Sequence, residues 1–154
     1  MAFDRLVEFI EAKGGAFDCG FIGLHTILHV LTKFGRNDIA MKMVAGREFP
    51  AYGYMLEMGE TSIPEKIMSD PMTAGSHNHH FLGDYARWLT FNVGGLCVID
   101  SKTVKITVGD FDNVDSASAW YDLPAGRVGI EWTKNDNGEK KIEVIAPEGV
   151  TVIR

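Results

Sequence analysis

The stretch "YARWLTFNVGGLCVID", Tyr85 to Asp100, is where the hydrophobic pattern of this 154-residue chain changes its period. Before it, apolar residues recur at the spacing of helices. After Gly94 and Gly95 they alternate with polar residues, as they do in strands. The sequence therefore predicts an α+β chain in two parts, with a helical part over residues 1–95 and a β part over residues 96–154.

Four helices are expected in the first part, from apolar residues that recur at i, i+3, i+4 and i+7 and from capping residues beside them. They cover residues 3–13, 20–35, 39–47 and roughly 79–93. The second helix is apolar on most sides, so we expect it to be deeply buried. Asn37 or Asp38 is expected to N-cap the third. A Gly- and Pro-rich loop from Phe49 to about Asn78 follows, and a loop of that length is usually functional or disordered.

Six short strands are expected in the second part, because polar and apolar residues alternate between turn signals. They cover residues 96–100, 102–108, 116–123, 126–134, 140–146 and 149–154. The turn "NDNG", Asn135 to Gly138, is typical of a hairpin. Val128, Ile130 and Trp132 share one face of their strand. The pattern favours an antiparallel β-unit, a small sandwich.

The composition excludes some partners. The net charge is −6 and the pI is near 5.3, which argues against a nucleic-acid surface or an anionic membrane surface. No apolar run is long enough to span a bilayer, and the amphipathic N-terminus does not resemble a signal peptide. As given, the chain is expected to be cytoplasmic, whereas a longer parent could be periplasmic or secreted. Cys19 and Cys97 do not require a disulfide.

Histidines suggest one kind of site. "GSHNHHFLGD", Gly75 to Asp84, holds three of the five histidines. His25 and His29 are four residues apart on an expected helix, which is a usable spacing for metal ligands, and His77 or His79 could add a third nitrogen. The alternative is that these two side chains hydrogen-bond locally. Because no HExxH motif is present, a metal-binding protein is the less favoured interpretation.

Carboxylates and aromatic residues in the long loop suggest another kind of site. Glu60 and Glu65 lie in it, and their charge does not tell them apart. Tyr52 and Tyr54 lie just before them, next to Phe49. Aromatic faces beside carboxylates suit a sugar, whose apolar face stacks and whose hydroxyls need polar partners. The alternative is core packing.

The order of these pieces resembles the C-terminal part of the bacterial α-L-rhamnosidases, glycoside hydrolase family 78. That family has a "T/C-G-F-x-G" helix start, a "G-R-x-D-L-A" helix, and then "Y-P-x-W/Y-G-Y-M", "G-A-T-T-x-W-E" and "S-x-N-H-Y-x-x-G-x-x-x-W-L". The corresponding segments of this chain read "DCGFIG", "GRNDIA", "FPAYGYM", "GETSIPE" and "SHNHHFLGDYARWL". The tail "SASAWYDLPAGRVGIEW" is also similar to the start of the family's C-terminal β-sandwich.

The resemblance implies an inverting hydrolase of terminal α-L-rhamnose, with no cofactor and no metal. The catalytic domain would be an (α/α)6 toroid, of which this chain carries about the last third. Glu65 aligns with the general base, and His79 with the histidine that contacts rhamnose. Tyr54 and Tyr52 would lie near the sugar. The general-acid Glu lies in an earlier family segment that this chain lacks, so we expect the chain to be inactive alone.

The chain departs from the family pattern beside the base, where Pro64 replaces an aromatic residue. His80 stands at an aromatic position and is expected to pack, whereas His77 is expected to face solvent. The alternative function is a non-catalytic module that binds carbohydrate or completes an assembly. Helices taken from a larger ring leave apolar faces uncovered, so we also expect a homo-oligomer that forms through exposed helical faces.

Overall fold

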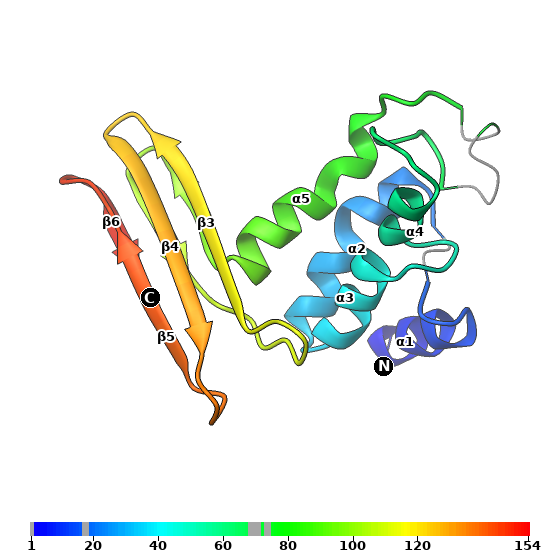
Figure 1. The fold of residues 1–154 in the computed structure, drawn as a ribbon, viewed down its shortest axis with the longest axis horizontal. Coiled ribbons are helices and arrows are strands. Elements are labelled where there is room, and N and C mark those ends of the chain that lie inside the picture. Colours follow the sequence, from blue (N-terminus) through cyan, green and yellow to red (C-terminus); the bar gives the residue numbers. More distant parts are fainter. Residues whose placement is uncertain (1, 17–18, 68–71, 73–74) are drawn as a thin grey trace. The chain divides into compact units, whose positions relative to one another are not determined.

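The computed structural model describes residues 2–16, 19–67, 72 and 75–154. The chain forms two compact units, Met1–Tyr85 and Ala86–Arg154, and the division falls inside one helical stretch. Figure 1 shows helices in the first unit and strands in most of the second. Helices give way to strands between Val93 and Leu96, where the change of sequence period places the transition.

The first unit is built from helices joined by short connections and one longer loop. Its elements are α1 (Ala2–Ala12), α2 (Phe21–Lys33), α3 (Asn37–Ala45), α4 (Tyr52–Glu57), the 3₁₀ turn η2 (His80–Gly83) and the start of α5 (Asp84–Trp88). α2 packs against both α3 and η2, and α3 also packs against α4. α2 is therefore the element that links the early helices to the segment that carries the histidines.

Apolar spacing explains which helix faces are buried, but α2 differs from the prediction. Leu24, Leu28 and Leu31 lie on one face of α2 and are almost fully buried. Ile22 is 75% exposed and Phe34, just after the helix, is 53% exposed. The prediction of a deeply buried helix was therefore wrong, because only one stripe of α2 meets the other helices of its unit.

Glycine ends α2 in the expected way. Gly35 has a φ of +77°, a left-handed conformation that glycine adopts without steric cost. This turn lets the backbone N–H of Arg36 donate to Leu31 O at 2.8 Å, and that of Gly35 donate to Thr32 O at 3.0 Å. The chain can then enter α3 at once.

The start of α3 does not follow the prediction. The helix begins at Asn37, so Arg36 occupies the N-cap position, and no side chain of the described residues caps it. Asp38 accepts hydrogen bonds from the Arg36 guanidinium instead. The predicted cap by Asn37 or Asp38 was wrong, because both residues already lie inside the helix.

The long loop contains one helix that the sequence pattern did not predict. α4 covers six residues of the predicted loop, and Tyr52 and Met55 are its buried side chains. Gly53 lies in close contact with the end of α3, since a Cβ there would come within 2.4 Å of Gly46 O. The glycine that suggested a loop therefore serves helix packing instead.

The predicted fourth helix is confirmed as a continuous helical stretch over residues 80–93. It changes pitch twice, from the 3₁₀ turn η2 to α5 and then to the π-helical turn η3 (Leu89–Val93). In the wider turn, Thr90 Oγ1 donates to Ala86 O at 3.0 Å, and Asn92 Nδ2 donates to Trp88 O at 3.2 Å. Such side-chain bonds compete with the regular helical ladder and favour its distortion.

The second unit holds all six predicted strands in two three-stranded sheets. They are β1 (Leu96–Asp100), β2 (Thr103–Ile106), β3 (Ser116–Leu123), β4 (Gly126–Lys134), β5 (Lys140–Ile145) and β6 (Thr151–Ile153). One sheet has the order β1-β2-β6 and the other β3-β4-β5. Five of the strands form antiparallel pairs as predicted, but β2 and β6 pair in parallel. The unit is therefore mostly antiparallel, as predicted, and contains one parallel pair that the sequence pattern did not predict.

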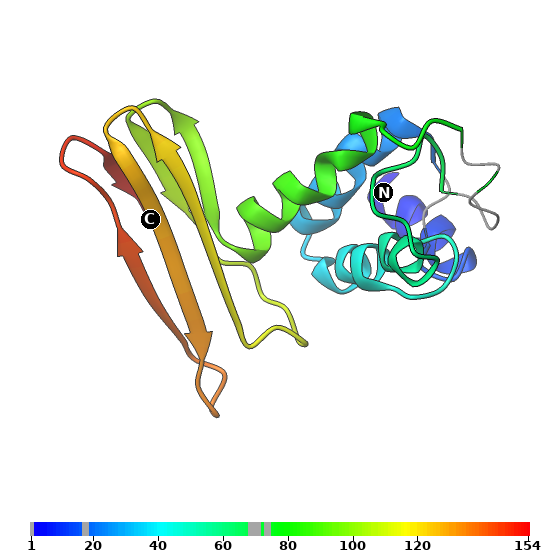
Figure 2. The ribbon, with the colours of Figure 1, turned by 45° about the horizontal axis from the view of Figure 1, so that its top comes forward.

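The two sheets share one hydrophobic core and lie face to face in Figure 2. Val128, Ile130 and Trp132 are 0%, 3% and 1% exposed, which confirms that they share the buried face of β4. The Trp132 indole N–H donates to Val93 O at 2.8 Å, so the end of η3 is fixed to the sheet of its own unit.

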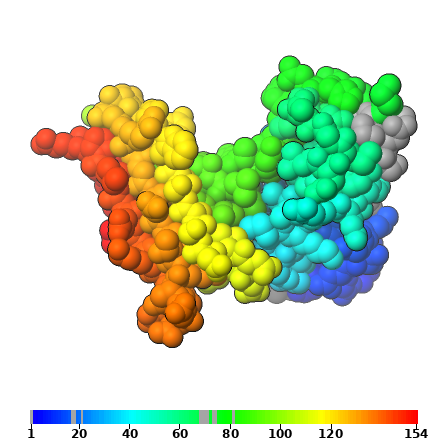
Figure 3. All heavy atoms as spheres, viewed as in Figure 1, coloured from blue at the N-terminus to red at the C-terminus, as the bar shows by residue number. Residues whose placement is uncertain are grey.

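The hairpin turn between β4 and β5 is also confirmed. The backbone N–H of Asn135 donates to Glu139 O at 3.0 Å, and Gly138 has a φ of +80°. In Figure 3 this turn forms the orange projection beyond the sheet. Among the described residues, no helix has the length and apolar character that crossing a bilayer would require.

Candidate functional site

Two segments of the loop region lie side by side and carry the predicted site residues. The backbone N–H of Glu65 donates to Ser76 O at 2.6 Å, and that of His79 donates to Ile63 O at 2.8 Å. The Ser62 hydroxyl donates to His77 O. These bonds join residues 62–65 to residues 76–79, so the backbone brings the segments of Glu65 and His79 together.

The structure separates the two loop carboxylates that charge could not distinguish. Glu60 pairs with the His77 imidazole at 3.0 Å, and its side chain is only 13% exposed. Glu65 is exposed, and its Oε2 lies 3.5 Å from the backbone nitrogen of Ser76. The carboxylate of Glu65 is therefore the one presented to solvent, whereas Glu60 is engaged by the His77 imidazole.

A glycine allows the close approach around Glu65. Gly75 has a φ of +81°, and a Cβ at this position would lie 2.7 Å from Glu65 Oε2. Any side chain there would displace the carboxylate or the turn. Pro64, which stands at the family's aromatic position, is fully buried. Its ring therefore anchors the loop and is not available to stack on a ligand.

The three clustered histidines have different surroundings. His79 is half-buried, and its ring lies parallel to that of His80 with 6.3 Å between centroids. His80 is exposed, so the prediction that it packs into the core was wrong, and its ring lies beside that of His79 instead. His77 is 45% exposed, in agreement with the prediction, and pairs with Glu60.

Tyr52 and Tyr54 lie on α4 in different environments. Tyr52 is 6% exposed, and its hydroxyl donates to Leu82 O at 2.6 Å. Burial raises the pKa of this phenol, with a smaller contribution from the negative charge of Asp84. Tyr54 is half-buried, and its ring meets that of Phe49 edge to face at 5.7 Å. Of the two, Tyr54 has the surface that a ligand could reach.

His25 and His29 meet a carboxylate that the sequence interpretation did not single out. His29 Nε2 lies 2.9 Å from Asp84 Oδ2, and His25 Nδ1 lies 3.7 Å from Asp84 Oδ1. Asp84 is 8% exposed. Its signal in the sequence is an acidic residue inside an apolar helical run. Within the described ranges, no three His, Cys, Asp or Glu side chains gather as a metal ion would require. His29 hydrogen-bonds to Asp84, which lies 55 residues further along the chain and not nearby in sequence.

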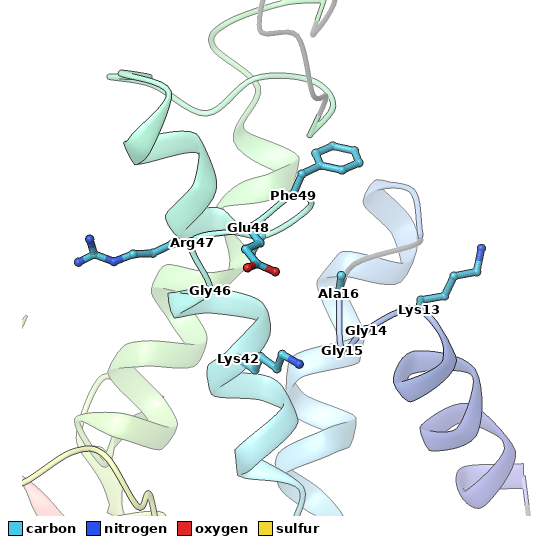
Figure 4. A pocket seen from close by; sticks show the side chains of 10 residues that line it. Lys13, Gly14, Gly15, Ala16, Lys42, Gly46, Arg47, Glu48 and Phe49 are labelled. Atoms are coloured by element: carbon cyan, nitrogen blue, oxygen red, sulfur yellow. The ribbon is translucent and has the colours of Figure 1, made fainter.

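A separate hollow of about 450 Å³ lies among the ends of α1 and α3 and the start of the long loop. Figure 4 shows Lys42 extending towards Gly15, whereas Lys13 and Arg47 point away. Arg47 pairs with Glu57 at 2.8 Å. None of the four predicted site residues lines this hollow, so it is distinct from the loop site.

Comparison with known proteins gives one family. Residues 1–93 match the model of the bacterial α-L-rhamnosidase six-hairpin glycosidase domain. An α-L-rhamnosidase of Streptomyces avermitilis is 32% identical over 89% of this chain. One from Formosa agariphila is 26% identical over 97% of it. The chain spans only 14% and 17% of the lengths of these two relatives.

Comparison with solved structures gives the same family. The crystal structure of the Streptomyces avermitilis α-L-rhamnosidase complexed with L-rhamnose superposes with a TM-score of 0.87, at 30% identity, over 97% of this chain and 15% of that one. The α-L-rhamnosidase from Dictyoglumus thermophilum gives a TM-score of 0.86 at 25% identity, over 96% of this chain and 17% of that one. The chain therefore belongs to the bacterial α-L-rhamnosidase family with the six-hairpin glycosidase domain.

Proposed function

We propose that the chain is the C-terminal part of an inverting α-L-rhamnosidase-like glycoside hydrolase that acts on terminal α-L-rhamnose. Residues 1–95 would complete an (α/α)6 toroid, and residues 96–154 would belong to a C-terminal β-sandwich. Family membership, and similarity to two solved rhamnosidases over nearly the whole chain, support this assignment. The helical unit and the two packed sheets are compatible with those two parts.

Glu65 is the proposed general base, and its exposed carboxylate is the observation that carries the proposal. An inverting enzyme holds two carboxyl groups roughly 6.5–9.5 Å apart, so that a water fits between the base and the sugar. The base removes a proton from that water while an acid protonates the leaving oxygen. Two backbone hydrogen bonds support this role, from Glu65 N–H to Ser76 O and from His79 N–H to Ile63 O. They restrain the loop segment that positions the carboxylate.

His79 and Tyr54 are the proposed sugar contacts. Both are half-buried, so each has a restrained ring with an accessible part. Tyr52 is also proposed to lie near the sugar. Its hydroxyl is engaged by Leu82 O, so its contribution would be to support the wall of the site rather than to donate to a ligand.

The chain alone is proposed to be inactive, because the second carboxyl group would come from a preceding family segment. Loss of general-acid catalysis typically costs about 10²–10⁴-fold in rate. The direct test is a chimera, in which this chain replaces the corresponding part of the Streptomyces avermitilis enzyme. We expect the chimera to hydrolyse an aryl α-L-rhamnoside, and the isolated chain to release no product.

Two matched variants of the chimera test the role of Glu65. Glu65→Gln should abolish hydrolysis, because an amide cannot accept the proton from water. Glu60→Gln, five residues earlier, should keep most of the activity, because that carboxylate pairs with His77. An active Glu65→Gln chimera, or an isolated chain whose activity depends on Glu65, would contradict the proposal.

An assembly role is the second candidate function. Large apolar side chains are exposed on the helical unit, including Ile22 at 75%, Leu56 at 73% and Phe9 at 64%. Exposed apolar surface of this kind commonly marks a protein contact. We propose that these helical faces associate, either with a second copy of the chain or with the rest of a toroid.

A further inference from the structure

One row of residues crosses the outer face of the β3–β4–β5 sheet. Trp120 on β3 lies opposite Gly129 on β4, and Gly129 lies opposite Ile145 on β5. Trp120 is 59% exposed and Ile145 is 75% exposed. Because neighbouring strands lie about 4.8 Å apart, two large apolar side chains stand about 10 Å from each other across a residue without a side chain.

Neither the backbone nor crowding requires a glycine at this position. Gly129 does not have a positive φ, and a Cβ there would meet only ordinary contacts, 3.7 Å from Ala119 O and 4.0 Å from Trp120 Cβ. Its neighbours Val128 and Ile130 point into the core, so position 129 points outwards. The missing side chain therefore leaves a trough, which forms part of a hollow of about 400 Å³.

Polar groups lie at both ends of the trough. Ser118, Glu131 and Glu143 form the adjacent cross-strand row. On the other side, Arg127 Nε donates to Asp122 Oδ1 at 2.7 Å. This pairing lowers the pKa of Asp122, so both of these groups are charged near neutral pH. Hydroxyl, carboxylate and guanidinium groups thus surround an apolar floor.

We propose that this trough binds one uncharged pyranose ring of a carbohydrate. The apolar C–H face of such a ring would stack on the Trp120 indole, and its hydroxyls would reach the polar groups at the ends. Glu131 disfavours an acidic sugar, and the other two charged groups are already paired, Arg127 with Asp122 and Glu143 with Lys141. The site lies in the second unit and is independent of the reaction proposed for Glu65.

The first experiment titrates the 154-residue chain with the methyl glycosides of L-rhamnose, D-glucose, D-galactose and D-mannose, and with the methyl glycoside of D-galacturonic acid, whose carboxylate is free. Tryptophan fluorescence reports on the trough, because Trp88 and Trp132 are buried and only Trp120 is exposed. We expect a saturable change with at least one neutral glycoside and an affinity about fivefold weaker for the galacturonate, since its carboxylate would face the carboxylate of Glu131.

Two variants test the trough itself. Gly129→Val fills the floor with a residue that suits a strand and keeps Trp120 as the reporter. Trp120→Ala removes the aromatic side of the trough, and glycoside binding to this variant is followed by calorimetry. Each variant should lower the affinity for the neutral glycoside by about tenfold or more. A good aromatic stack alone contributes up to about tenfold in affinity, in addition to the effect of the area it buries. Tyr121→Ala is the control, because Tyr121 is 51% exposed but alternates to the opposite face.

Several results would overturn the proposal. One is the absence of saturable binding for every neutral glycoside. Another is an unchanged affinity in both Gly129→Val and Trp120→Ala. A third is that the variants change only the molecular mass measured by light scattering, which would indicate a protein contact. Binding of L-rhamnose that is lost in Glu65→Gln but kept in Gly129→Val would assign the sugar to the helical unit instead. A negative result here would leave the proposed role of Glu65 unaffected, because the chimera measures that role separately.

Discussion

His29 Nε2 lies 2.9 Å from the carboxylate of Asp84, a buried residue 55 positions further along the chain. This contact joins α2 to the start of α5, and His25 adds a longer one at 3.7 Å. Because removing one partner of a buried hydrogen bond costs about 1–3 kcal/mol, Asp84→Ala should lower the free energy of unfolding by about that amount. Urea denaturation followed by the helical circular dichroism signal measures it.

The two distances also predict an order among variants. His29→Ala should cost more stability than His25→Ala, because only His29 lies within hydrogen-bond distance of Asp84. Asp112→Ala serves as the control for removing a carboxylate, since Asp112 is exposed, and it should change stability by less than about 0.5 kcal/mol. Equal losses for the two histidine variants would contradict the geometry.

Gly75→Ala should disturb the loop that carries Glu65. A left-handed φ costs a non-glycine residue about 1–2 kcal/mol, and the new Cβ would also collide with Glu65 Oε2. Gly59→Ala is a matched control, because Gly59 has the same φ of +81° but open space around its Cα. In the chimera, Gly75→Ala should therefore reduce the rate of rhamnoside hydrolysis much more than Gly59→Ala. Similar rates in the two variants would mean that the approach of Gly75 to Glu65 does not matter.

Local patterns in the sequence were enough to predict most elements of the fold. Helical spacing located every helical stretch except α4, and alternation located all six strands, including the buried face with Val128, Ile130 and Trp132. These are properties of neighbouring residues. The parallel pairing of β2 with β6 joins segments nearly fifty residues apart, and no local pattern encodes such a choice.

The candidate site was only partly predictable for the same reason. Composition placed Glu60 and Glu65 in one loop but could not separate them, and the difference came from a long-range pairing of Glu60 with His77. Asp84 was missed because a single acidic residue on a helix is ordinarily solvated. Its importance depends on two histidines that only the packing of α2 against η2 brings near.

Acid should weaken the pairing of Arg36 with Asp38 at the start of α3. The guanidinium of Arg36 bonds to Asp38 and to Glu11, and the bond from Arg36 lowers the pKa of Asp38 below its ordinary value of 3.8. A carboxyl whose pKa is lowered on folding stabilises the folded state fully at pH values above its ordinary pKa. The stabilisation is lost as the pH falls through the lowered pKa. The effect should stay below about 1 kcal/mol, because the pair is half-exposed and screened by solvent.

The measurement compares thermal unfolding of the chain and of Asp38→Asn at pH 7 and near pH 3. The variant should unfold at a lower temperature at pH 7, and its difference from the unmodified chain should shrink at the lower pH. An equal difference in unfolding temperature at both pH values would indicate that Asp38 stabilises the fold through packing rather than through its charge.

Exposed apolar residues on α2 should make the chain associate. Ile22 is 75% exposed, and burying such a side chain at a contact contributes about 1.5–3 kcal/mol. We expect light scattering to give a mass above that of one chain at high concentration, and Ile22→Glu to reduce it. Ile99→Glu is the matched control, since Ile99 is 55% exposed on β1 and lies outside the helical unit. A monomer at every concentration, or an equal effect of both substitutions, would contradict association through the helices.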